Sequence, residues 1–165
     1  MKRSQSHVRK LQPLSAHSAE IVRVLGIDLG SKRIGIAASD RSGTIASPLV
    51  VLQRGASQRV DHAEILKIVL EEEAEAIVVG LPLNMDGSEG TAAKSARMEA
   101  DRMATVVGVP VYIHDERRST VEGDRVLMER GLNAQDRRKV IDKVAAAVIL
   151  QSWLDAGNLG DVRGR

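Results

Sequence analysis

The chain has 165 residues, of which 43% are hydrophobic and 28% are charged, a composition typical of one soluble globular domain. It contains no cysteine, which excludes disulfide scaffolds, thiolate zinc sites and cysteine nucleophiles. No apolar run is long enough for a membrane helix, and the polar N-terminus has no apolar segment typical of a secretory signal. We therefore expect a cytoplasmic protein with no membrane partner.

Charge and aromatic content restrict the kinds of partner. Net charge is only +2, and Tyr112 and Trp153 are the only aromatic residues, which argues against a platform that stacks single-stranded bases. Eight Lys and Arg residues lie between Arg117 and Lys143. A polyanion would prefer this stretch, although a charged solvated face has the same pattern.

The first part of the chain predicts a tail followed by three strands. Residues 1–20 show no periodicity and are expected to form a flexible tail. The apolar runs 21–29 and 34–39 predict a hairpin with a tight glycine turn. Residues 48–52 predict a third strand, and its first residue, a proline, favours an edge position.

Helices and strands then alternate. Residues 57–73 predict a helix, 76–80 an interior parallel strand, 91–107 a second helix and 111–114 another strand. On the first of these helices we expect the acids to face solvent and the following residues to face the core: Val60, Ala63, Leu66, Val69 and Leu70.

The end of the chain predicts further helices. A capping box at Ser119 opens a helix that Gly131 would close. Asn133 can cap a last helix ending before Gly157, whose apolar stretch 144–150 should be buried all round. This order of elements predicts an α/β fold, a mixed sheet with helices on both faces. We expect one domain over residues 21–157 and a C-terminal tail over 158–165.

Asp28 is the first candidate for chemistry. It lies inside an apolar strand, where an unpaired carboxylate would cost several kcal/mol, so a cation or hydrogen bonds must compensate for it. Gly26 and Gly30 beside it leave room for a ligand near the backbone. The alternative is a carboxylate at a frayed strand end that is capped by the amides of the turn.

Three further acids also lie in or beside apolar segments. Asp115 and Glu116 follow a strand and should point to opposite faces, so only one of them should share a site with Asp28. Asp142 precedes the apolar part of the last helix. Each has a structural alternative, since the first two could belong to a charged turn and Asp142 could favour a helix dipole.

Taken together, these acids predict a site for hard divalent cations. Mg²⁺ takes oxygen ligands, and two such ions can stabilise the attacking and leaving oxygens of phosphodiester hydrolysis. The four histidines have no metal spacing, and neither a nucleophile elbow nor a P-loop occurs. The loop over residues 80–87 could present amides to an anion or could be a plain strand–helix connection.

Four motifs, in order and at the expected separations, resemble the YqgF/RuvX family over about residues 22–155. They are residues 26–30 with 33–37, residues 79–87, residues 114–117 with Ser119 and Thr120, and residues 142–143 with 145–147 and 150–152. The resemblance implies a ribonuclease H-like fold, here with five strands, and a nuclease dependent on Mg²⁺ or Mn²⁺. Members of the family are described as Holliday junction resolvases and as nucleases that mature the 5′ end of 16S ribosomal RNA.

The family's acidic positions fall on Asp28, Glu116 and Asp142, which the resemblance implies as metal ligands and catalytic residues, with Asp115 as a neighbouring candidate. Related junction resolvases carry four carboxylates, whereas positions 145 and 146 here are alanine, which counts against resolvase-like cleavage. The bases nearest these acids are expected to contact phosphates: Lys32, Arg33, Arg117 and Lys143.

Three functions remain open at this point. A nuclease acting on pre-16S ribosomal RNA is favoured by the family rather than by any one residue. A resolvase of DNA junctions would need a symmetric dimer, and we expect a monomer or a weak homodimer. The third is a non-catalytic RNA- or ribosome-associated module. An ATP-binding protein of the sugar-kinase type would need a second domain, for which 165 residues leave no room.

Overall fold

A computed structural model describes residues 22–115 and 134–157. The tails predicted over 1–20 and 158–165 lie outside the described residues, as does the helix predicted from Ser119 to Gly131.

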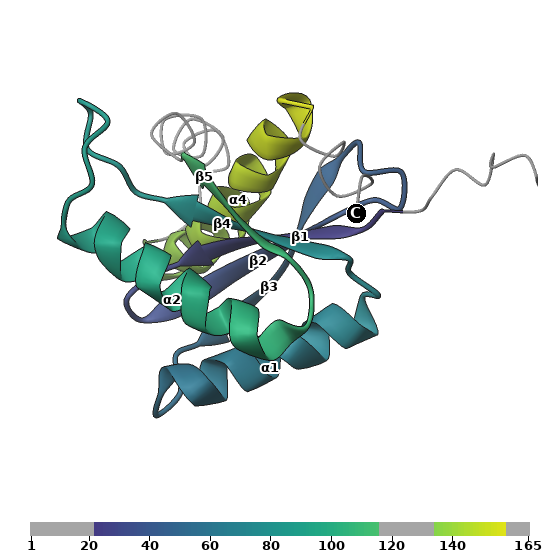
Figure 1. The fold of residues 1–165 in the computed structure, drawn as a ribbon, viewed down its shortest axis with the longest axis horizontal. Coiled ribbons are helices and arrows are strands. Elements are labelled where there is room, and N and C mark those ends of the chain that lie inside the picture. Colours follow the sequence, from purple (N-terminus) through teal and green to yellow (C-terminus); the bar gives the residue numbers. More distant parts are fainter. Residues whose placement is uncertain (1–21, 116–133, 158–165) are drawn as a thin grey trace, which may run out of the picture.

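Five strands form one mixed sheet, as predicted (Figure 1). The order across the sheet is β3-β2-β1-β4-β5; β1, β2 and β3 pair antiparallel, and β4 and β5 run parallel to β1. β3 is an edge strand, which explains why it tolerates Pro48. The strands are β1 (Val24–Leu29), β2 (Arg33–Ser39), β3 (Ala46–Gln53), β4 (Ala76–Leu81) and β5 (Val111–Asp115).

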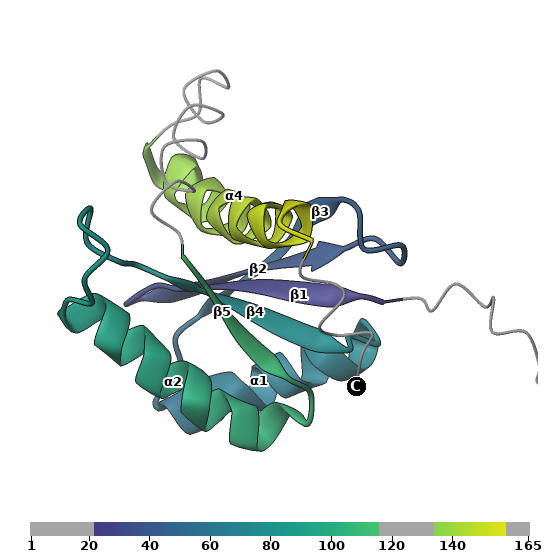
Figure 2. The same ribbon diagram turned by 45° about the horizontal axis from the view of Figure 1, so that its top comes forward.

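Helices cover both faces of this sheet, which confirms the predicted architecture. α1 (Gln58–Glu71) and α2 (Thr91–Val107) pack on one face. α4 (Ala134–Asp155) crosses the other face, as Figure 2 shows with the sheet nearly edge-on. The strand–helix order of the sequence is therefore realised as three layers.

Strand alternation divides the buried residues between two cores. In β1, Leu25 and Ile27 belong to the core under α1 and α2, whereas Val24 belongs to the core under α4. Gly26 and Asp28 share the side of Val24, because successive residues of a strand face opposite ways. Asp28 therefore points to the layer that α4 occupies.

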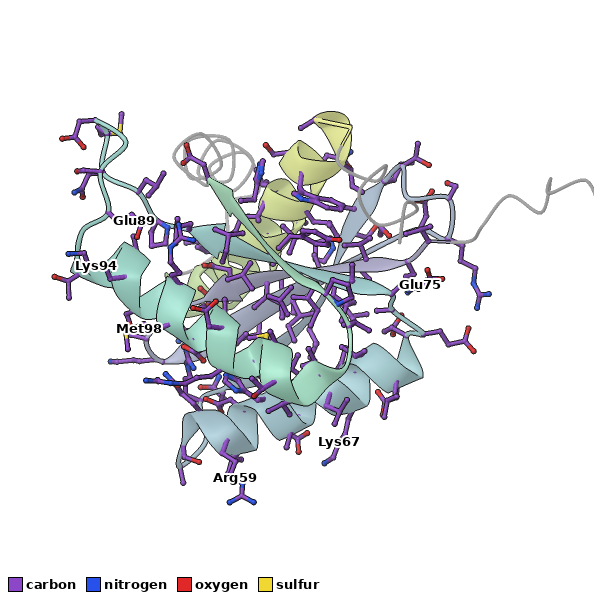
Figure 3. All side chains as sticks on the ribbon, viewed as in Figure 1. Arg59, Lys67, Glu75, Glu89, Lys94 and Met98 are labelled. Atoms are coloured by element: carbon purple, nitrogen blue, oxygen red, sulfur yellow. The ribbon has the colours of Figure 1, made fainter. Side chains whose placement is uncertain are left out.

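The face of α1 that packs on the sheet differs from the predicted one. Val60 is 47% exposed and Leu70 is 68% exposed, and Figure 3 shows Arg59 and Lys67 extending away from the outer side of the helix. The prediction failed because two polar residues belong to the inward face, where Asp61 is paired with Arg54 from outside the helix and His62 with Glu99 of α2. The buried residues of α1 are Asp61, His62, Ile65 and Val69.

The prediction that residues 144–150 are buried all round is also wrong. Ala146, Ile149 and Leu150 are buried against the sheet, but Val144 and Val148 are only half-buried. α4 is the only helix on its face of the sheet in the described part of the chain, so one of its sides packs and the other does not.

Candidate active site

Asp28 lies near the carboxyl end of β1, at the edge of the sheet where the parallel strands β4 and β5 also end. In α/β sheets, ligand sites collect at this edge. Asp28 pairs with Gly35 of β2 in the antiparallel ladder, so the ladder fixes its backbone. Its side chain is partly buried on the face covered by α4.

Two glycines let α4 approach the strands closely. A Cβ atom on Gly26 would lie 2.6 Å from the Cβ of Leu150 and 2.7 Å from the carbonyl oxygen of Ala146. A Cβ atom on Gly35 would lie 1.9 Å from the carbonyl oxygen of Asp142. No other residue fits at these positions without moving the helix, so the two glycines place Asp142 beside Asp28.

The two carboxylates repel each other. Burial, and then the negative charge of Asp142, raise the pKa of Asp28 to about 6. Asp142 has a cationic partner, because Arg33 Nε donates a hydrogen bond to its Oδ2 at 2.5 Å. The guanidinium of Arg33 thus pairs with Asp142, and a further cation beside Asp28 would relieve the repulsion between the two acids.

This pair of carboxylates fits a hard divalent cation, which prefers oxygen ligands. The burial of Asp28 also favours a cation there, since a buried carboxylate is destabilising without a positive partner. Across residues 22–115 and 134–157, no three acidic or histidine side chains gather closely enough to hold a metal ion. Asp28 and Asp142 therefore offer two ligands, and Glu116, the third acid expected from the sequence, lies outside the described residues.

Asp115 and His114 end β5 on opposite faces. Tyr112 packs in the core under α4, whereas Ile113 packs under α1 and α2, so alternation places Asp115 with Ile113, on the face away from Asp28. His114 is on the α4 face, where its Nε2 lies 2.9 Å from Ser152 Oγ. Burial lowers the pKa of His114. Asp115, the acid of β5, therefore lies on the opposite face of the sheet from Asp28 and Asp142.

The expected phosphate-binding bases occupy different settings. Lys32 is exposed in the turn between β1 and β2, and Lys143 is half-buried next to Asp142 on α4. Arg33 contacts Asp142 as described above, so its guanidinium orients an acid of the site. Arg117 lies outside the described residues.

The loop between β4 and α2 is closed by its own hydrogen bonds. The amide of Asn84 donates to the carbonyl of Ser88 at 2.9 Å, and the amide of Ser88 donates to Asp86 Oδ1 at 2.9 Å. Gly87 has a φ of 86°, a left-handed conformation that glycine adopts readily in a tight turn. In Figure 3 the loop stands at the end of α2 marked by Glu89 and Lys94. Its binding to an anion stays a prediction.

A second group of charged residues was missed by the sequence analysis. Asp61 and Glu99 are 4% and 3% exposed, and both accept hydrogen bonds from Arg54. A hydrophobic pattern cannot identify them, because they replace apolar residues on the inward faces of α1 and α2. The available signal was Ile65 and Val69, four and eight positions after Asp61, which together mark the buried face.

Comparisons with known proteins show which family and relatives this chain is similar to. Residues 22–156 match the family model described as RuvX, Holliday junction resolvase. A protein of Myxococcus xanthus named "Putative pre-16S rRNA nuclease" is 47% identical over 135 residues, which are 82% of this chain and 89% of that protein. A protein of Listeria innocua with the same name is 39% identical over 138 residues, covering 83% of this chain and 100% of the relative.

The fold also has a solved counterpart. The structure of T. thermophilus RuvC in complex with a Holliday junction substrate superposes with a TM-score of 0.54 at 22% identity, covering 84% of this chain and 96% of that one. This likeness confirms the ribonuclease H-like fold. In the part of the chain that the structure describes, no helix has the length and apolar character needed to span a bilayer. From the family match and the identity to these relatives, the chain belongs to the RuvX family of nucleases.

Proposed function

We propose that this protein is a nuclease dependent on Mg²⁺ or Mn²⁺ that hydrolyses phosphodiester bonds of pre-16S ribosomal RNA during maturation of its 5′ end. The observation that carries the chemistry is the pair formed by Asp28 and Asp142, two acids from opposite ends of the chain that share one face of the sheet. The names of the relatives support the choice of substrate.

Each residue of the site has a role in this proposal. Asp28 and Asp142 would hold the divalent cation, and Glu116 would complete its ligands. A bound cation supplies positive charge that stabilises the attacking and leaving oxygens at phosphorus. Arg33 orients the carboxylate of Asp142 through its hydrogen bond. Asp115 has no role, because it follows the opposite face of β5.

Bases at the rim of the site would bind the RNA backbone. Lys32 is exposed at the end of the sheet where Asp28 lies, and Lys143 follows Asp142 on α4. Arg117 would add a third positive charge. Such contacts position a nucleic acid without reading its sequence, so they serve RNA and DNA alike.

A four-way DNA junction is the second candidate substrate, because the matching family model is described as a junction resolvase. The absence of a fourth acid one helical turn beyond Asp142, where positions 145 and 146 are alanine, favours RNA processing over resolvase-like cleavage. A resolvase would also have to act as a symmetric dimer to cut two strands.

The test compares cleavage of two end-labelled substrates, a 5′-extended 16S precursor RNA and a four-way DNA junction. Each is incubated with Mg²⁺, Mn²⁺ or EDTA, using the wild-type protein, Asp28→Asn, and the control Asp101→Asn, which changes an exposed acid of α2. We expect metal-dependent cleavage of the RNA that Asp28→Asn reduces by about 10³-fold, because metal stabilisation of the transition state is worth several kcal/mol.

The control should cleave as the wild-type protein does. Cleavage of the junction but not of the RNA would replace the proposed substrate with DNA. A wild-type protein that binds RNA but cleaves neither substrate under any metal condition would identify a non-catalytic module.

A further inference from the structure

A buried cluster of charged residues lies on the face of the sheet opposite Asp28. Asp61, His62 and Glu99 are each less than 5% exposed, at 4%, 2% and 3%, and Arg54 joins them from the segment after β3. None of them reaches the carboxylates of the candidate site. A group of buried charges is costly unless each finds a partner, so the geometry of the cluster shows what it holds in place.

Arg54 is the centre of this cluster. Its Nη1 and Nη2 donate to the two carboxylate oxygens of Glu99 at 2.6 and 3.1 Å, and Nη1 also donates to Asp61 at 3.2 Å. His62 Nε2 lies 3.3 Å from Glu99. The paired bonds to Glu99 fix the plane of the guanidinium, and a fixed plane also fixes the direction of its remaining donor, Nε–H.

That remaining donor reaches the turn between β1 and β2. Arg54 Nε donates to the carbonyl of Gly30 at 3.0 Å, and the backbone amide of Arg54 donates to the carbonyl of Lys32 at 2.9 Å. Arg54, which follows β3, thus donates hydrogen bonds to two carbonyls of the β1–β2 turn.

The turn itself leads directly into the candidate site. It begins two residues after Asp28, and a Cβ atom on Gly30 would lie 2.5 Å from the carbonyl of Arg33, so the turn is tightly closed. Lys32 is exposed on it, and the next residue, Arg33, donates to Asp142. The positions of both bases therefore depend on how the turn is held.

We propose that Arg54 is a positioning residue for nucleic-acid binding: oriented by Glu99 and Asp61, it fixes the β1–β2 turn so that Lys32 meets a phosphate beside Asp28. This inference rests on the proposed function. Asp28 itself is held by the strand ladder with Gly35 and not by Arg54. The affinity for RNA should therefore depend on Arg54, whereas the affinity of the carboxylates for a cation should not.

The variant Arg54→Lys tests this division in the full chain. Lysine keeps the positive charge but cannot bond both oxygens of Glu99 and also reach Gly30, because an ammonium lacks the fork of a guanidinium. We expect the dissociation constant for the precursor RNA, measured in EDTA to prevent cleavage, to rise about tenfold as a charged contact is lost. The slope of the logarithm of the binding constant against the logarithm of salt concentration should decrease by about 1, which corresponds to one phosphate contact.

Two further readouts separate positioning from a loss of general stability. The dissociation constant for Mn²⁺, followed by calorimetry, should change by less than about twofold, because the ladder holds Asp28. Hydrogen exchange at the amides of Gly30 and residue 54, which donate to the carbonyls of Asp28 and Lys32, should become faster than in the wild-type protein, because the turn loses the side-chain bond to Gly30.

Arg23→Lys is the matched control. Arg23 forms a half-buried ion pair with Glu72 that ties the start of β1 to the end of α1, away from the turn. It should lower the Tm while leaving RNA affinity unchanged. Glu99→Gln is the second variant in case Arg54→Lys does not fold; it keeps the side-chain shape and should weaken RNA binding in the same direction.

Three results would overturn the inference: unchanged RNA affinity in Arg54→Lys and Glu99→Gln, equal losses of RNA and Mn²⁺ affinity, or unchanged exchange in the turn. None of these readouts requires catalysis. A wild-type protein that binds RNA without cleaving it would overturn the proposed nuclease activity. The inference about Arg54 would still be decided by the dissociation constants for RNA and Mn²⁺ in the variants relative to the wild-type protein.

Discussion

The two faces of the sheet treat buried acids in opposite ways. Under α1 and α2, Asp61 and Glu99 share the guanidinium of Arg54. Under α4, Asp28 and Asp142 lie side by side, and burial together with their repulsion raises the pKa of Asp28. The first arrangement is balanced by side chains of the chain itself, whereas the second would be completed by the cation that we propose to bind there.

This contrast separates acids that are paired within the fold from acids that we propose to bind a cation. Buried carboxylates whose oxygens are held by a planar guanidinium stabilise the fold only as long as every partner is present. A buried carboxylate placed beside another acid destabilises the fold. Such pairs are common at functional sites, where a bound ligand stabilises the charged form. The following experiments test whether the two faces differ in this way.

Removing an acid from the balanced face should cost the most stability. Glu99→Ala leaves the Arg54 guanidinium buried without its main partner, so we expect the free energy of unfolding to fall by about 3–5 kcal/mol. Urea unfolding at neutral pH measures the change. A loss below about 1 kcal/mol would mean that the cluster is not a unit of the fold.

Removing an acid from the other face should raise the free energy of unfolding rather than lower it. The pKa of Asp28 is about 6 in the folded chain against an ordinary 3.8, so between about pH 4 and pH 6 the folded chain binds more protons than the unfolded chain. Its contribution to stability therefore falls as the pH rises through this window and stays low above it.

We expect Asp28→Asn to be more stable than the wild-type protein at about pH 7.5 by up to about 2–3 kcal/mol, and equally stable near pH 4. Urea unfolding in EDTA at both pH values measures the difference, and Mg²⁺ should reduce it by stabilising only the wild-type protein. A variant less stable than the wild-type protein at the higher pH would contradict the contrast between the faces.

The approach of α4 can be tested at Gly35. In Gly35→Ala the new methyl group would overlap the carbonyl of Asp142, so the helix must shift, at a cost of about 1–3 kcal/mol. Affinity for Mn²⁺ should fall as well, since Asp142 moves with the helix. Gly55→Ala is the control, because its nearest neighbour is a methyl group of Val60, which can move.

An exposed ion pair gives the smallest effect. Lys67 Nζ lies 2.6 Å from Glu64 on α1, but the two side chains are 64% and 48% exposed. We expect Lys67→Ala to leave the urea unfolding curve nearly unchanged, because water screens such pairs. A larger loss would show that exposure does not distinguish this pair from the one between Arg54 and Glu99.

Much of the fold could be predicted from the sequence, because alternation and periodicity report directly on burial. The edge position of β3 followed from Pro48, and the run that forms β4 was recognised as an interior strand. The inward face of α1 could not be found in this way, since Asp61 and His62 occupy it. Their burial depends on Arg54, which bonds Asp61, and on Glu99, which lies beside His62; both contacts form only when the chain folds.

The candidate site was predicted in part. The acids in apolar contexts identified Asp28 and Asp142, which the structure brings together. The sequence did not reveal that Gly35 controls their approach, because a glycine in a strand gives no sign of which backbone lies on it. The role of Arg33 was also missed, since a base next to a turn resembles a phosphate contact until its acidic partner is in place.

The position of α4 also has a consequence for the order of events during synthesis. Among the elements that the structure describes, Asp28 belongs to the first strand in chain order and Asp142 to the last helix. The face that α4 covers, with Val24, Ala37 and Val78, has no cover until that helix has emerged. A nascent chain would therefore carry half of the site without its counterpart, and cleavage of RNA near the translating ribosome would have to wait until the helix has docked.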